Sequence, residues 1–261
     1  MAVQIVDGRP LYYTRPGRSP AGSNLLLLHG AGGSHLDWPR EIQRLRGFNV
    51  YNLDLPGHGR SEGAGYDEID AFARDVDAFV VALGLKDVCV AGHSMGGAIA
   101  QSLALWQPDW LSSMVLIGSG AHLPVSPQIL AGLETNAEEA VSLIMSYAWQ
   151  GESTPEWADL ARAAMLAGDS EQLYNSFLAC DNFDLRQELG EIDRPVLVIC
   201  GSEDRLTPVE YGRDLAVGIP QARLVIIEDA GHFVTLERPQ AVAEEMAIFL
   251  NDLARSIDNG S

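Results

Sequence analysis

Basic residues are few in this chain, and lysine is almost absent. Of its 261 residues, 36 are acidic and 17 are basic, and the only lysine is Lys86, so the formal net charge at pH 7 is −19. A surface this acidic repels the phosphates of nucleic acids and the headgroups of anionic lipids. We therefore expect no nucleic-acid partner and no stable association with a membrane.

Cysteines and long hydrophobic runs are also scarce. Cys89, Cys180 and Cys200 are odd in number and widely spaced, which favours free buried thiols in a reducing compartment over a disulfide framework. No uninterrupted apolar run approaches the roughly 20 residues of a membrane span, and the N-terminal residues lack a signal-peptide pattern. We expect a cytoplasmic protein that is a monomer or a homodimer.

Hydrophobic residues make up 47% of the chain, enough for a sizeable core, and many of them fall in six short runs. Each run is continuously apolar, which is typical of strands that are covered on both faces in a parallel sheet. The runs cover residues 25–28, 50–53, 88–91, 114–117, 196–200 and 224–227. Helical patterns separate most of them, so the sequence predicts an α/β fold.

Apolar spacing predicts helices over residues 66–83 and 95–106, and another that opens at Pro239. Between about 121 and 190 no strand-like run occurs. Three helices are predicted there: one over 136–149, one with Thr154 and Pro155 as its cap and first turn, and one from Ser170. We therefore divide the chain into a first core part (1–120), an all-helical insertion (121–190) and a second core part (191–261).

The segment 88–97, VCVAGHSMGG, joins a buried strand to a helix through a GxSxG motif. Such a sharp strand–turn–helix connection holds the central serine in a strained backbone conformation at the carboxyl edge of the sheet. A Cβ atom at Gly92 or Gly96 would collide with a neighbouring strand or helix. Ser94 is therefore the candidate nucleophile.

A serine nucleophile needs a base and a group that orients the base. His232 follows the last strand-like run and is expected at the same edge as Ser94, whereas His93 lies on the turn itself and is expected to point away. The turn after residues 196–200 offers two acids, Glu203 and Asp204. We choose Asp204 as the orienting group, with Glu203 as second choice. Asp229, which lies close to His232 in the sequence, is a distant third.

The segment 29–33, HGAGG, forms a loop of small residues whose amides can approach a substrate closely. The amides of Ala31 and Met95 are expected to form an oxyanion hole. The loop lacks a GxxxxGK[ST] motif, and the histidines around it lack the spacing of metal ligands. We expect neither a metal nor a cofactor, and we expect the turn at 54–61 to brace this loop.

Five motifs in this order, HGAGG, DLPGHGRS, GHSMGG, GSEDRLTP and AGHF, together resemble the α/β-hydrolase superfamily, in the branch with a helical cap after the sixth strand. The resemblance implies the α/β-hydrolase fold, with a mostly parallel eight-stranded sheet flanked by helices. It also implies Ser94, Asp204 and His232 as the triad, with Ala31 and Met95 as oxyanion donors. Haloalkane dehalogenases and soluble epoxide hydrolases carry an aspartate in place of Ser94, which disfavours those reactions.

We expect a cofactor-independent serine hydrolase that cleaves small-molecule carboxylic esters of small to medium acyl chain through an acyl-enzyme. Two alternatives on the same triad are a lactonase and a hydrolase of carbon–carbon bonds in ring-cleavage products, for which Arg162 or Arg186 could hold a substrate carboxylate. A slow-turnover receptor is an alternative from another class. Possible pocket residues are Trp38, Met145, Trp149, Trp157 and Met165, although such residues at helical spacing more often belong to the core.

Overall fold

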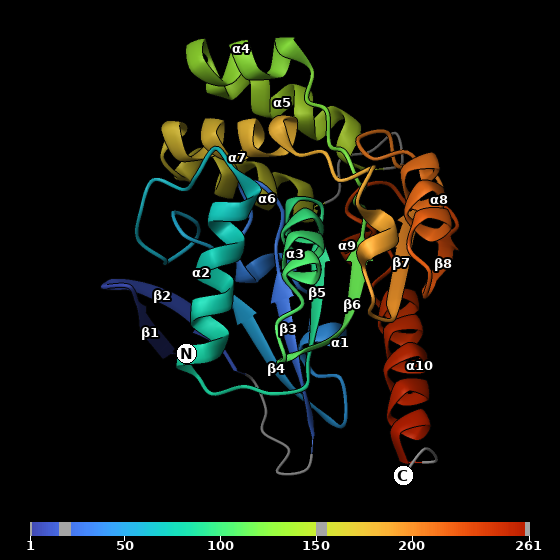
Figure 1. Ribbon diagram of the computed structural model, residues 1–261. Helices are drawn as coiled ribbons and strands as arrows, with labels where there is room; N and C mark the ends of the chain where they lie inside the picture. Colours follow the sequence, from blue (N-terminus) through green and yellow to red (C-terminus); the bar gives the residue numbers. More distant parts are fainter. Residues whose placement is uncertain (1, 16–21, 150–155, 259–261) are drawn as a thin grey trace.

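A computed structural model describes residues 2–15, 22–149 and 156–258 of the protein (Figure 1). An eight-stranded sheet runs through it in the order β1-β2-β4-β3-β5-β6-β7-β8. The strands are β1 (Ala2–Val6), β2 (Arg9–Thr14), β3 (Ser23–Leu28), β4 (Phe48–Leu53), β5 (Val88–His93), β6 (Leu111–Ile117), β7 (Val196–Gly201) and β8 (Ala222–Ile227). In this order, each strand from β4 onward to β8 is parallel to the next, whereas β2 pairs antiparallel with both β1 and β4. The predicted mostly parallel sheet is confirmed.

The six predicted runs lie inside β3 to β8, and β3 explains why they are continuously apolar. Leu26 and Leu28 pack in the core on one face of the sheet, whereas Leu25 and Leu27 pack in the core on the other. All four are fully buried because helices cover both faces. The hairpin of β1 and β2 has no such run, since one face of its outer strand is exposed, and the sequence did not predict it.

Helices lie on both faces of the sheet (Figure 1). The first core cluster contains residues of α2 (Ile69–Ala82), α3 (Met95–Trp106) and α8 (Val209–Gly218). The second contains residues of α1 (Arg40–Gln43), α9 (Val234–Glu237) and α10 (Pro239–Asp258). The helices predicted over 66–83, over 95–106 and from Pro239 are confirmed, although the first begins only at Ile69.

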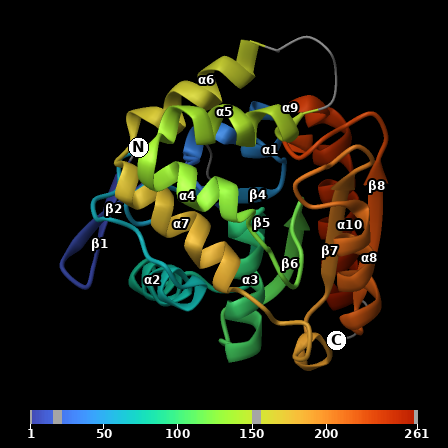
Figure 2. The ribbon, with the colours of Figure 1, turned by 90° about the horizontal axis from the view of Figure 1, so that it is seen from above.

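In the described part of the chain, four α-helices between β6 and β7 lie above the carboxyl ends of the strands, as Figures 1 and 2 show. They are α4 (Pro127–Thr135), α5 (Ala137–Ala148), α6 (Glu156–Ala167) and α7 (Ser170–Asn182). The two ends of the segment that carries these helices lie side by side, as the hydrogen bond from the Leu185 amide to the Ala121 carbonyl at 2.7 Å shows. The predicted cap residues Thr154 and Pro155 lie outside the described residues. The sequence missed α4.

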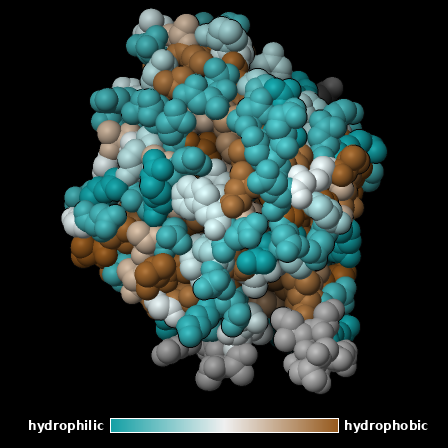
Figure 3. All heavy atoms as spheres, in the orientation of Figure 1, coloured by the Kyte–Doolittle hydropathy of each residue, from teal (hydrophilic) through white to brown (hydrophobic). Residues whose placement is uncertain are grey.

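The surface agrees with the acidic composition. On the face shown in Figure 3, hydrophilic side chains cover much of the molecule and hydrophobic ones form scattered patches. The three cysteines are buried and free, as predicted. Within residues 2–15, 22–149 and 156–258, no helix has both the length and the apolar character of a membrane span.

Candidate active site

Ser94 lies at a strained turn between β5 and α3. Its backbone has φ 53° and ψ −117°, in a region that L-residues rarely adopt. A Cβ on Gly92 would lie 2.1 Å from the Gly96 carbonyl oxygen, and a Cβ on Gly96 would lie 2.2 Å from that of Leu28. The two glycines therefore permit the close packing that presents Ser94 at the carboxyl edge of the sheet, as the motif predicts.

The loops after β7 and β8 bring Asp204 and His232 together. The Asp204 carboxylate and Nδ1 of His232 are 2.9 Å apart, and both side chains are buried. Three further bonds hold this carboxylate: the amides of Leu206 and Thr207 donate to Oδ1 at 2.9 and 2.8 Å, and the Thr207 hydroxyl donates to Oδ2 at 2.7 Å. The acid that contacts His232 is thus Asp204, whereas Glu203 is exposed.

The environment of Asp204 favours its charged form. Burial by itself raises the pKa of the carboxyl, but the positive potential of His232 and the hydrogen bonds from His232 and Thr207 outweigh burial and leave the pKa below its usual value. An ionised Asp204 fixes Nδ1 of His232 as the protonated nitrogen. The other nitrogen, Nε2, is then available as a base.

His93 packs against His232, contrary to the expectation that it points away from the site. The two ring centroids are 4.8 Å apart, and Nε2 of His93 is 2.9 Å from the carbonyl oxygen of His232. Burial lowers the pKa of His93 to about 3, so its ring is neutral at pH 7 and donates its Nε2–H to this carbonyl. His93 therefore holds the backbone of the loop that carries His232.

A cavity of about 340 Å³ joins these residues. Ser94, His93 and His232 line it, together with Gly30 and Ala31. Much of the remaining wall is apolar and comes from the helical segment and nearby loops: Leu123, Val125, Ile129, Leu143, Ile144, Met165, Phe177 and Phe233. A mostly apolar cavity with a few converging polar groups is typical of a small-molecule site.

Hydrogen bonds fix the orientation of the loop after β3. Nε2 of His29 accepts from the Leu55 amide at 3.0 Å, so Nδ1–H of His29 donates to the Gly30 carbonyl at 2.8 Å. The Gly33 amide donates to the same carbonyl at 3.1 Å. The Gly30 carbonyl and the Ala31 N–H belong to one trans peptide and point in opposite directions. The Ala31 N–H therefore points away from the groups that donate to this carbonyl.

The Met95 amide lies at the first position of α3, where the initial N–H groups of a helix have no intrahelical acceptor. The Ser94 carbonyl, on the same peptide, points into the helix and accepts from the amides of Gly97 at 2.9 Å and Ala98 at 3.3 Å. The Met95 N–H therefore points away from the helix. The Met95 side chain is fully buried in the core, so only its backbone can serve a substrate.

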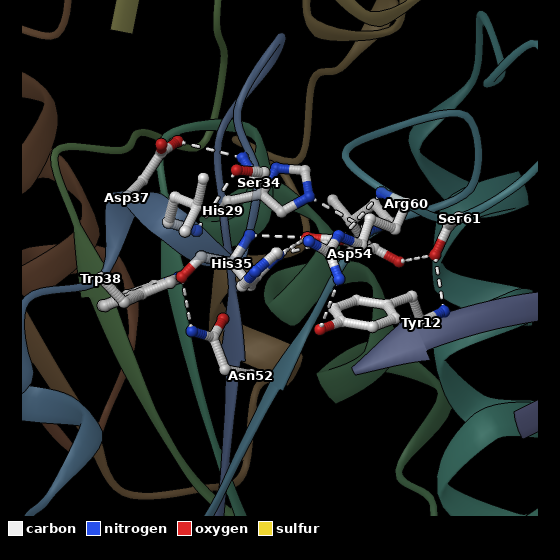
Figure 4. Close-up of polar contacts among 12 residues, drawn as sticks. Tyr12, His29, Ser34, His35, Asp37, Trp38, Asn52, Asp54, Arg60 and Ser61 are labelled. Atoms are coloured by element: carbon white, nitrogen blue, oxygen red, sulfur yellow. Dashed lines mark hydrogen bonds and ion pairs between the residues drawn. The ribbon is translucent and has the colours of Figure 1, made fainter. Parts of the chain in front are cut away.

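The turn at 54–61 braces the first loop, as predicted, and Figure 4 shows its polar contacts. Asp54 accepts from the backbone amide of His35 at 2.6 Å, from Nδ1 of His35 at 2.8 Å and from the Arg60 amide at 2.9 Å. The Ser61 hydroxyl donates to the Asp54 carbonyl at 2.6 Å and accepts from the Tyr12 amide at 2.9 Å. Within the described residues, no three His, Cys, Asp or Glu side chains are grouped to hold a metal ion.

Several residues proposed for the pocket lie elsewhere. Trp38 packs with Leu25 and Ile42 in the core on the far face of the sheet, because the chain turns behind β3 after the first loop. Met145 is buried among the helices of the insertion, and Trp149 packs against Trp157 with ring centroids 6.1 Å apart. Of the five pocket candidates only Met165 lines the cavity.

The two arginines considered as carboxylate ligands are also elsewhere. Arg162 pairs with Glu138 at 3.1 Å and Arg186 pairs with Asp184, both near the surface. Two charged residues that the sequence did not single out, Asp37 and Arg205, line the cavity instead. Asp37 lies outside the five motifs, and Arg205 lies within GSEDRLTP, but the motif does not predict that its side chain lines the cavity.

A second contact between a serine and a histidine occurs away from the cavity. Ser176 Oγ lies 3.2 Å from Nε2 of His58, but Nε2 of Gln172 also donates to this nitrogen at 2.6 Å. Burial lowers the pKa of His58 to about 3. This neutral, occupied imidazole joins α7 to the turn at 54–61 and is not available as a base.

Comparison with known proteins gives several hydrolases. A relative from Comamonas testosteroni, 2-hydroxy-6-oxo-6-phenylhexa-2,4-dienoate hydrolase, is 28% identical over 250 residues, which cover 87% of this chain and 86% of that protein. The structure of a thermophilic esterase is 33% identical and covers 97% of both chains, with a TM-score of 0.85. The enol-lactonase from Burkholderia xenovorans LB400 is 25% identical and covers 96% of this chain and 100% of its own, with a TM-score of 0.88.

The names of these three proteins specify different activities, so the likeness to them does not select a substrate for this chain. The family model, by contrast, matches most of the chain, over residues 25–245. This chain therefore belongs to the alpha/beta hydrolase family.

Proposed function

We propose that the protein is a serine hydrolase that cleaves carboxylic esters through an acyl-enzyme, with Ser94 as nucleophile, His232 as general base and Asp204 as its orienting acid. The observation that carries the proposal is the shared cavity: Ser94, presented by a strained turn, lines the same 340 Å³ space as a histidine whose Nδ1 is bound to a buried carboxylate. A serine and an oriented histidine that line one cavity support nucleophilic catalysis by serine.

The reaction follows from the roles of these groups. His232 takes the proton of the Ser94 hydroxyl through Nε2 as the oxygen attacks the ester carbonyl, and the amides of Ala31 and Met95 bind the resulting oxyanion. The protonated His232 then gives its proton to the leaving alkoxide. Water, deprotonated by His232, attacks the acyl-enzyme in the same way and releases the acid. Asp204 stabilises the imidazolium in both steps.

The most direct test replaces the nucleophile. The Ser94→Ala variant should lose nearly all ester hydrolysis, by about 10⁵-fold or more, and keep its melting temperature. Ser176→Ala is a matched control, because Ser176 also touches a histidine but lies outside the cavity. Hydrolysis of p-nitrophenyl esters and labelling by a fluorophosphonate give the two readouts. Ester hydrolysis that survives in Ser94→Ala would overturn the assignment.

The size of the cavity supports small and medium acyl chains. A panel of esters of increasing acyl length, assayed beside an enol-lactone and a ring-cleavage dienoate, compares the proposed activity with those named for the relatives. We expect kcat/KM for the esters to peak at a short or medium chain and to exceed the values for the other two substrates. A rate that keeps rising to lipid length, or a preference for the dienoate, would contradict the proposed substrate class.

A further inference from the structure

One acidic side chain in the cavity has no role in the proposed reaction. Asp37 ends a short 3₁₀ helix, η1 (His35–Asp37), and lines the same cavity as Ser94 and Ala31. Figure 4 shows its carboxyl group apart from the contact between His35 and Asp54. Asp37 therefore takes no part in the contact between His35 and Asp54, and it borders the space in which a substrate would bind.

The local sequence places this carboxyl group. Oδ2 of Asp37 accepts from the Ser34 amide at 3.2 Å, and the Ser34 hydroxyl accepts from the Leu36 amide at 3.2 Å, so the two side chains cap η1 reciprocally. A Cβ at Gly33 would lie 2.2 Å from Oδ2 of Asp37. The glycine thus leaves room for the carboxyl group beside the loop that carries the Ala31 amide.

No partner neutralises this carboxyl group. In the described part of the chain, no lysine, arginine or histidine forms an ion pair with Asp37. Burial raises its pKa to about 7; the hydrogen bond from the Ser34 amide opposes this effect, the negative Asp54 adds to it, and His35 opposes it. Asp37 is therefore close to half ionised at neutral pH, and its charge grows as the pH rises.

The other titratable side chains of the cavity do not pair with Asp37. His93 is neutral and donates to the His232 carbonyl, and His232 is bound to Asp204. The exposed Arg205 donates to the Ser146 carbonyl and lies over the Tyr147 ring, with its Cζ 5.1 Å from the ring centroid. A cationic substrate group that enters the cavity would therefore meet a carboxyl group that has no ion-pair partner among the described residues.

We propose that Asp37 determines specificity by charge: it favours substrates that carry a cationic group, such as a quaternary ammonium, over neutral substrates of the same shape, and it disfavours substrates that carry a carboxylate. The proposal rests on the proposed function, because it concerns the ester that Ser94 attacks. Its physical basis is the attraction between opposite charges in a largely apolar cavity, where water screens them weakly.

The test uses two pairs of isosteric esters in which a trimethylammonium group replaces a tert-butyl group. In the first pair the group is on the alcohol (butyrylcholine and 3,3-dimethylbutyl butyrate). In the second pair it is on the acyl chain (the ethyl esters of 4-trimethylammoniobutanoate and 5,5-dimethylhexanoate). The readout is the ratio of kcat/KM within each pair, in which any pH dependence common to the two esters cancels. Asp37→Asn keeps the shape of the side chain and an acceptor for the Ser34 amide.

For at least one pair, we expect the wild-type ratio to favour the cation and to rise as the pH increases through about 7. Asp37→Asn should lower that ratio about tenfold above this pH and make it independent of pH. The control is Asp159→Asn, which removes an equal charge from an exposed position on α6. Ratios that Asp37→Asn leaves unchanged in both pairs, or that Asp159→Asn lowers equally, would overturn the proposal.

A binding measurement separates this proposal from the proposed function. Calorimetry on Ser94→Ala, with and without Asp37→Asn, compares choline with its neutral isostere 3,3-dimethylbutan-1-ol. Loss of the preference for choline in the double variant supports the charge selection even where no ester is hydrolysed. Equal binding of the two alcohols to Ser94→Ala, together with unchanged ester ratios, contradicts the role of Asp37 and leaves the serine hydrolase intact.

Discussion

Two pairs of histidine and aspartate in this molecule, each with a buried carboxylate, have nearly the same distance between the two groups. Nδ1 of His232 is 2.9 Å from the carboxylate of Asp204, and Nδ1 of His35 is 2.8 Å from that of Asp54. Backbone amides also donate to each carboxylate. In both, burial raises the pKa of the aspartate, and its partners outweigh burial and lower it.

What differs is the space beyond the histidine. His232 lines the cavity that also contains Ser94, whereas His35 does not line that cavity and sits in the brace of the first loop. Under the proposed function, the first pair orients a base, whereas the second pair holds a loop. A contact between histidine and aspartate is therefore not by itself evidence of catalysis, and the candidate nucleophile in the same cavity distinguishes the first pair from the second.

Replacing each histidine by asparagine should separate the two roles most strongly. An asparagine amide can still donate to the aspartate, as Nδ1–H does, but it has no nitrogen that acts as a base. His232→Asn should therefore lower kcat by about 10⁴-fold or more, whereas His35→Asn should lower it by less than about tenfold. Steady-state ester hydrolysis gives both values, and His35→Ala shows the cost of losing the donor. Equal losses in the two asparagine variants would contradict the comparison.

Replacing each aspartate should separate activity from stability. Asp204→Asn should lower kcat by about 10⁴-fold, because the neutral amide no longer stabilises the imidazolium. Asp54→Asn should instead lower the free energy of unfolding by about 2 kcal/mol, since the amides of His35 and Arg60 lose a charged acceptor. Urea denaturation and kcat, measured on both variants, check this. A loss of kcat in Asp54→Asn as large as that in Asp204→Asn would show that the brace takes part in the chemistry.

The contrast between these pairs also explains what could be predicted from the sequence. Ser94, Asp204 and His232 each follow a continuously apolar run, so their place at one edge of a parallel sheet follows from the order of the elements. The hairpin of β1 and β2 was missed because its edge position leaves no continuous apolar run. The division of the chain at residues 120 and 190 remains a prediction, as does the cytoplasmic location.

Residues whose role depends on the direction of a loop could not be predicted. Trp38 and Asp37 are adjacent in the sequence, yet Trp38 packs in the core behind the sheet and Asp37 faces the cavity. The turn of the 3₁₀ helix decides this, and apolar spacing does not report it. His93 likewise differs from the expectation, because its ring direction depends on the loop that carries His232.

Asp37 differs from the two buried aspartates because it has no histidine partner. Its pKa rises from 3.8 to about 7, whereas those of Asp54 and Asp204 fall. Between these two pH values the folded chain keeps a proton that the unfolded chain has released, so the group lowers stability as the pH rises through this window. Asp37→Asn removes this titration. At about pH 8 the variant should exceed the wild type in free energy of unfolding by about 1–3 kcal/mol, and at about pH 4 the two should agree. Urea denaturation at the two pH values measures this difference, with Asp159→Asn as the exposed control. If Asp37→Asn is less stable than the wild type at the higher pH, the carboxylate of Asp37 has a partner in the folded protein.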